Sequence, residues 1–212
     1  MIQNFQIKIV DNFFSEKDYQ ELLQRKKIVV KENEIKVYHN SINTNLEVKS
    51  ESISEDLILR IHKNYHEKVF KILEELSPEK AKLYEYTDLV LAETGANYSY
   101  PIHDDTPNKL LSGVIYIEPE KNSGTSFYKS RFGKSPEQVE WKKNRAVFFS
   151  RKEWTTWHAY SGNGISNRIV LIYNLNTTKI KEVYKIENKN FYFGKLRHGI
   201  NPYLYRFFKN II

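Results

Sequence analysis

The stretch TWHAYSGNGISNRIVLIYNL, residues 156–175, contains two β-strand patterns separated by a polar turn. Tyr, Val, Ile and Leu dominate the two patterns, and Gly162 and Gly164 fall between them. Aromatic and β-branched residues favour strands, and glycine favours turns, so this stretch predicts two successive strands. His158 lies on the first strand, and Arg168 begins the second.

Strand and turn patterns of the same kind extend on the N-terminal side of this stretch. Seven short runs rich in Tyr, Val, Ile and Phe follow Leu83, and clusters of Gly, Asn and Pro separate them. The runs lie near residues 84–93, 97–103, 111–119, 125–129, 145–150, 156–161 and 168–175. So many short strands in a row predict a β-sandwich or a β-barrel.

The N-terminal part of the sequence predicts a strand followed by helices. Phe5, Ile7 and Ile9 alternate with polar residues, as in a half-buried strand. Ser15 precedes a short helical pattern and is a suitable N-cap. Between residues 52 and 76, apolar residues recur mostly at helical spacing, which predicts a long helix.

The sequence predicts a single domain. Its 212 residues suit one sizeable hydrophobic core, and neither a repeat nor a linker-like composition divides them. We expect a strand and supporting helices in residues 1–83, a β-rich body in residues 84–178 and a C-terminal extension in residues 179–212.

Composition limits the classes of site and partner. The chain has no cysteine, which excludes disulfides and thiolate metal sites, so a bound metal would need imidazole, carboxylate or carbonyl ligands. Polar residues interrupt the first 14 positions, MIQNFQIKIVDNFF, so we expect a cytoplasmic protein with no membrane partner. The net charge of +7 is scattered, and the lack of a long basic run favours a solvated surface over nucleic-acid binding.

Two candidate metal ligands lie at the end of a strand pattern in YSYPIHDDTPN, residues 98–108. Residues two positions apart in an extended chain face the same side, so His103 and Asp105 can approach one ion while Asp104 points elsewhere. Such a triplet also arises by chance, but His158 adds a second imidazole. Two histidines and one carboxylate are the ligand set of many non-haem Fe(II) enzymes, and this set leaves coordination positions open.

Arg168 is a candidate anion-binding residue. It begins a strongly apolar strand, where an unpaired charge would be costly. A guanidinium forms paired, charge-assisted hydrogen bonds with a carboxylate. Each residue alone has an ordinary alternative: His158 could be a core histidine among aromatic side chains, and Arg168 a surface cation at a strand end.

Together these residues resemble the 2-oxoglutarate- and Fe(II)-dependent oxygenase superfamily, in particular its prolyl 4-hydroxylase-like branch. The resemblance covers residues 94–174, and residues 9–23 resemble the strand-then-helix opening of that branch. The family's metal motif is His-x-Asp followed about fifty residues later by His. Asp105 and His158 are 53 positions apart, and Arg168 follows His158 by ten, as the family's basic residue does.

The resemblance implies a fold and a chemistry. The fold would be mainly β, with a double-stranded β-helix core, a jelly roll like that of the cupins, and N-terminal α-helices packed on it. His103, Asp105 and His158 would bind Fe(II). The enzyme would use 2-oxoglutarate and O₂ to hydroxylate a substrate and would release succinate and CO₂, and ascorbate could support turnover.

The resemblance also implies which residues hold the keto acid; of these, Tyr116 and Tyr100 match the family less closely than Arg168 does. Arg168, Tyr116 and Tyr100 would bind 2-oxoglutarate or line its site. Many small-molecule oxygenases carry Arg-x-Ser at the basic residue, and here Val170 replaces that serine, which favours the prolyl 4-hydroxylase-like branch. Trp157 and Tyr160 lie beside His158 and either shape the opening for substrate or pack in the β-rich core.

The substrate and two competing functions stay open at this stage. A prolyl residue, another amino-acid side chain of a peptide or protein, a nucleobase or a small metabolite would all suit the chemistry. We expect the loops at residues 40–52 and 129–139 to select among them. A cupin-type metal-binding isomerase or dioxygenase, or a non-enzymatic basic β-domain that binds nucleic acid, would use a similar fold.

Overall fold

The computed structural model describes residues 5–24 and 30–198. Seven strands form one sheet: β1 (Ile7–Val10), β2 (Ile35–Asn43), β3 (Val48–Lys49), β4 (Tyr86–Thr94), β6 (Lys109–Glu118), β9 (Ala146–Phe149) and β11 (Arg168–Asn176). Four strands form another: β5 (Ser99–His103), β7 (Ser126–Tyr128), β8 (Glu137–Gln138) and β10 (Trp157–Ser161). The labelled helices are α1 (Glu16–Leu23), α2 (Glu55–Leu76), α3 (Pro78–Ala81) and α4 (Ile180–Ile186), and residues 191–198 are also helical.

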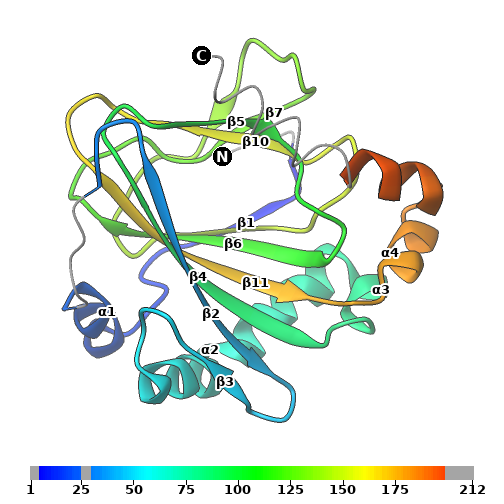
Figure 1. Cartoon of the computed structure of the whole chain (residues 1–212), viewed down its shortest axis with the longest axis horizontal. Coiled ribbons are helices and arrows are strands. Elements are labelled where there is room, and N and C mark those ends of the chain that lie inside the picture. The colour runs from blue at the N-terminus through cyan, green and yellow to red at the C-terminus, as the bar shows by residue number, and fades with distance from the viewer. Residues whose placement is uncertain (1–4, 25–29, 199–212) are drawn as a thin grey trace.

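The two sheets lie face to face, and helices cover the outer side of the larger one (Figure 1). The order of the larger sheet is β1-β9-β6-β11-β4-β2-β3, and that of the smaller sheet is β5-β10-β7-β8. All pairings are antiparallel. This arrangement confirms the mainly β, jelly-roll architecture with N-terminal helices packed on it.

The seven strands expected after residue 83 and the two N-terminal helices are present, but β2, β3 and β8 were not expected. The stretch at residues 40–52, expected to be a loop, contains the end of β2 and all of β3, and the stretch at 129–139 contains β8. Polar residues fill much of β2, and only two of its nine residues are fully buried, so its sequence lacks a clear apolar alternation. Its pairing with β4 along the whole strand makes it a strand.

The alternation along β11 separates two interiors. Successive side chains of a strand point to opposite faces of the sheet. Ile169, Leu171, Tyr173 and Leu175 join the core between the larger sheet and the helices. The other set faces the smaller sheet and lines a cavity; it consists of Arg168, Val170, Ile172 and Asn174.

Helix α2 closes the outer core. Ser54 caps it by accepting a hydrogen bond from the backbone N–H of Leu57, and Pro78 follows its end. Its buried stripe consists of Leu57, Ile58, Ile61, Tyr65, Val69, Ile72 and Leu73. Burying each of the large side chains contributes about 1.5–3 kcal/mol, so the stripe fixes the helix on the sheet.

The C-terminal extension begins with α4, and its residues 199–212 lie outside the described residues. Within residues 5–24 and 30–198, no helix has both the length and the apolarity needed to cross a bilayer.

The pH dependence of the folding stability should depend on His66. His62 and His66 stack on α2 with ring centroids 4.4 Å apart, and the His66 ring is 5.0 Å from that of Tyr84. Burial, with a smaller effect from His62, lowers the pKa of His66 to about 4. In the unfolded chain His66 takes up a proton at about pH 6.5, whereas in the folded protein it does so only near pH 4. The contribution of the neutral His66 ring to the free energy of unfolding is therefore complete above about pH 6.5 and is lost as the pH falls toward about 4.

We therefore expect His66→Phe, which keeps a ring against Tyr84, to lose less stability than wild type between about pH 6.5 and about pH 4. Urea unfolding across this range measures the difference, because the other titrating groups are the same in both proteins. Identical pH slopes for the two proteins would contradict it.

Candidate metal centre

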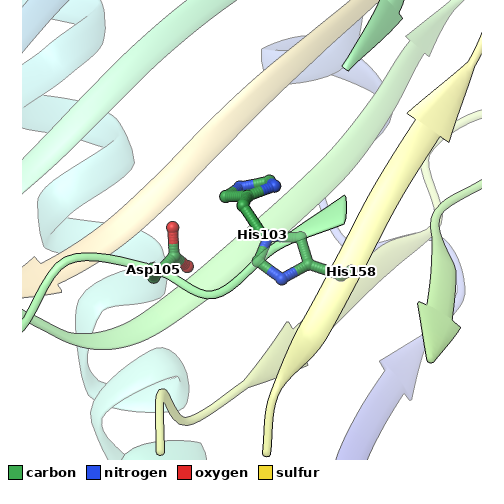
Figure 2. A group of neighbouring side chains, drawn as sticks. All are labelled: His103, Asp105 and His158. Atoms are coloured by element: carbon green, nitrogen blue, oxygen red, sulfur yellow. The ribbon is translucent and has the colours of Figure 1, made fainter. Parts of the chain in front are cut away.

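His103, Asp105 and His158 come together between the two sheets (Figure 2). One potential ligand atom from each lies within 4.8 Å of the others. The cause is the pairing of β5 with β10, which sets His103 directly opposite His158, with ring centroids 4.2 Å apart. Asp105 follows two residues after His103, so the three side chains can reach one ion.

The protonation of the two imidazoles suits metal binding. Burial lowers the pKa of His103 to about 3 and also lowers the pKa of His158, so both rings are neutral at pH 7. The Nδ1 atoms lie 3.0 Å from the carbonyl oxygen of Pro101 and 2.9 Å from that of Thr156. A carbonyl only accepts, so each Nδ1 carries the proton and each Nε2 keeps a free lone pair.

Asp105 is held ionised and oriented by neighbours that the sequence analysis did not identify. Lys109 Nζ donates to its Oδ1 at 2.6 Å, and Ser112 Oγ donates to its Oδ2 at 2.6 Å. Burial alone would raise the pKa of Asp105, but the Lys109 ammonium holds it far below its usual range. The carboxylate is therefore negative in the site at neutral pH.

Asp104 points away from the other three residues, as the extended geometry predicts. Its carboxylate accepts hydrogen bonds from Arg197 at 2.5 Å and from the backbone N–H of Trp154 at 3.1 Å. On the same side, Arg151 is fully buried and donates from Nε to the backbone carbonyl of Asp105 at 3.1 Å. The chain around Asp105 is thus fixed from behind by buried charged groups.

His103, Asp105 and His158 line a cavity between the two sheets, and the volume of this cavity is about 440 Å³. Arg168 lines the same cavity. Arg168 is only 6% exposed, and burial lowers its pKa, although a guanidinium stays charged at neutral pH. Its guanidinium lies over the Tyr160 ring, 3.8 Å from the centroid. No carboxylate in the described part of the chain pairs with it, and its Nε is buried without a hydrogen bond. Such a group is suited to an anionic ligand.

The tyrosines expected near the keto acid occupy different places. Tyr100 lines the cavity beside His103, with ring centroids 4.5 Å apart. The Tyr116 hydroxyl accepts from the backbone N–H of Thr125 at 2.8 Å and donates to its Oγ1 at 3.1 Å. Thr125 lines the cavity, whereas Tyr116 stacks on Trp141 behind Arg168, 5.7 Å from its guanidinium.

Trp157 and Tyr160, which the sequence places either at the substrate opening or in the β-rich core, are both buried. Tyr160 is 5% exposed, stacks on Arg168 and donates from its hydroxyl to Asn122 Oδ1 at 3.0 Å. Trp157 is 3% exposed and donates to the carbonyl of Trp154, outside the cavity lining. Nor do residues 40–52 or 129–139 line the cavity; β2 contributes Ile35, Val37 and His39 instead.

Searches against protein families and curated proteins found no match. Solved structures do match. A prolyl-4-hydroxylase from Pseudomonas putida superposes with a TM-score of 0.55 at 12% identity, covering 82% of this chain and 93% of that one. A prolyl hydroxylase from Trichoplax adhaerens, in complex with a hypoxia inducible factor oxygen degradation domain peptide fragment, gives 0.56 at 12% identity, covering 85% and 87%.

The chain shares the fold of these enzymes. An oxidoreductase of the 2OG-Fe(II) oxygenase family from Burkholderia pseudomallei matches in the same way, with a TM-score of 0.55 at 10% identity over 81% of this chain and 84% of that one. At such identities the likeness concerns the fold alone, so the assignment of chemistry depends on the site itself.

Proposed function

We propose that this chain is an Fe(II)- and 2-oxoglutarate-dependent oxygenase that hydroxylates an amino-acid side chain or a small molecule. One observation carries the proposal: two neutral imidazoles, one ionised carboxylate and an unpaired buried guanidinium share a single cavity. The fold that the chain shares with oxygenases of this class supports the same conclusion.

The donor groups fit the metal and the keto acid. His103 and His158 would each offer Nε2, and Asp105 would offer a carboxylate oxygen, with Lys109 and Ser112 holding that carboxylate in place. When bound, iron and 2-oxoglutarate supply the oxidation of a C–H bond by O₂, with release of succinate and CO₂. Two nitrogens and one oxygen form the ligand set of such sites.

Arg168 would hold the distal carboxylate of 2-oxoglutarate. Its guanidinium can form two parallel hydrogen bonds with a carboxylate, and the stacked Tyr160 ring restricts its movement. The low polarity around it strengthens the interaction, because little water competes. Thr125 reaches the same cavity and can add a hydroxyl contact, while Tyr116 would act by holding Thr125.

These features favour the oxygenase over the alternatives. A nucleic-acid-binding β-domain has no need for two imidazoles and a carboxylate meeting in a buried cavity. A cupin-type enzyme could use the metal ligands, but it would leave the unpaired charge of Arg168 without a role.

Turnover of 2-oxoglutarate tests the proposal. We expect wild type, supplied with Fe(II), ascorbate and O₂, to form succinate from 2-oxoglutarate even without its substrate. His103→Ala should lose this activity, while His62→Ala, a histidine change on α2 far from the ligands in sequence, should keep it. Failure of wild type to bind Mn(II) and 2-oxoglutarate would refute the proposed function.

A further inference from the structure

The face of the larger sheet that is turned toward the smaller sheet forms the floor of the cavity. A row of polar side chains crosses this floor at the end opposite Arg168. Asn174 lies directly opposite Asp88 of β4 on one side and Ser112 of β6 on the other. All three line the cavity. Arg168 and Asn174 are six residues apart on one strand face, which is about 20 Å of extended chain. The row is therefore separate from the end of the cavity assigned to the keto acid.

Asp88 is a carboxylate without an ion-pair partner in the part of the chain that the structure describes. Its Oδ2 accepts a hydrogen bond from Asn176 Nδ2 at 2.8 Å, which fixes the side chain. Within the described residues it forms no ion pair; Lys109, which also lines the cavity, pairs with Asp105 instead. Burial raises the pKa of Asp88 above its usual range, and the nearby basic groups of His39 and Lys109 offset only part of that rise.

Asn174 gives an independent sign of a missing ligand. It is 2% exposed, and its Oδ1 is buried without a hydrogen-bond partner. A buried acceptor without a donor is costly, and a ligand that donates hydrogen bonds removes that cost. Asp88 and Asn174 thus offer two neighbouring acceptors on the cavity floor, and one of them is a carboxylate that a bound cation would keep ionised.

We infer that this end of the cavity binds a cationic, hydrogen-bond-donating group of the substrate, an ammonium or a guanidinium, through Asp88 and Asn174. This inference rests on the proposed function, because the substrate that binds here is the one that the proposed reaction would oxidise. Neighbouring strands are about 4.8 Å apart, so Asp88 lies about 10 Å across the sheet from Ser112, which holds Asp105. The carbon that is oxidised is therefore separated from the cationic nitrogen by an aliphatic chain, as in lysine or arginine.

Matched pairs of compounds test the charge. We expect L-arginine or L-lysine, either free or within a short blocked peptide, to stimulate succinate formation by wild type, and L-citrulline and L-norleucine to do so at least about tenfold less well. Comparison of the free amino acid with the peptide shows whether the cationic group belongs to a small molecule or to a peptide side chain. Equal stimulation by the neutral compounds, or no response to any cationic compound, would overturn the inference.

Variants of Asp88 test whether this residue binds the cationic group. Asp88→Asn should raise the KM for the cationic compound by at least about tenfold, while Asp88→Glu, which keeps the charge, should retain the preference over the neutral compound. Asp56→Asn, an exposed change on α2, is the matched control and should behave as wild type. A cooperative thermal transition shows that each variant is folded, and an unchanged KM in Asp88→Asn overturns the inference.

Binding separates this inference from the proposed function. The thermal shift produced by L-arginine relative to L-citrulline can be measured without metal, since neither Asp88 nor Asn174 is a proposed ligand of iron. A selective shift in wild type that is lost in Asp88→Asn supports the cation site even if 2-oxoglutarate is not turned over. Absence of that shift, in a protein that does turn over 2-oxoglutarate, overturns the cation site alone.

Discussion

Arg168→Met should make the protein more stable and, at the same time, unable to use 2-oxoglutarate at ordinary concentrations. A buried charge without a partner costs stability, and methionine fills similar space without that cost, so we expect a gain of about 1–3 kcal/mol in the free energy of unfolding. Loss of a charge-assisted carboxylate contact should raise the KM for 2-oxoglutarate by about 100-fold.

The Arg168→Met protein is thus expected to gain stability while it loses affinity for 2-oxoglutarate, and a purely structural role for Arg168 would give neither result. Urea unfolding of the metal-free protein measures the first, and succinate formation against 2-oxoglutarate concentration measures the second. Arg131→Met, which removes an exposed arginine, is the matched control and should change neither. A destabilised Arg168→Met protein with an unchanged KM would mean that Arg168 is a structural cation and would remove the main support for the keto-acid site.

His158→Ala should abolish metal binding and activity. The change removes one of the three proposed side-chain ligands, so the loss of Mn(II) affinity should exceed the ~100-fold that is typical when a residue behind a ligand is removed. Succinate formation should fall at least as far. Titration with Mn(II) and the succinate assay measure the two losses.

Added imidazole provides a positive control for this variant. The space left by the ring lies between Phe149 and His103, whose centroids are 4.6 Å and 4.2 Å from that of His158. A free imidazole can occupy this space and offer the missing nitrogen, so we expect partial recovery of activity. Wild-type Mn(II) affinity in His158→Ala without imidazole would contradict the metal centre.

The sequence could predict the cluster of His103, Asp105 and His158 because part of its geometry is local. His103 and Asp105 are two positions apart in an extended chain, and the backbone itself turns both to one side while Asp104 turns to the other. The same period places Arg168 and Asn174 on one face of β11, so Asn174 could have been identified as a partner in the cavity. The structure agrees with these local expectations.

Other parts of the site depend on contacts that no local pattern contains. The burial of Arg168 depends on its contacts with Tyr160, Tyr116 and Trp141, which come from separate parts of the chain. Lys109 and Ser112 lie only four and seven residues after Asp105, but their bonds to its carboxylate depend on the turn that leads into β6. The same holds for β2, a strand of mixed polarity that exists because β4 pairs with it.

The sequence by itself determined the order of the N-terminal strand, the two N-terminal helices and seven of the strands after residue 83, and the side of each of these strands on which a residue lies, because these follow from backbone periodicity and capping. Only the tertiary structure decided that β5 and β10 pair with His103 opposite His158. It alone also decided that Arg168 and Asp88 face one cavity without ion-pair partners among the described residues. Register and burial arise from packing between distant segments, so the pattern within any one segment cannot specify them.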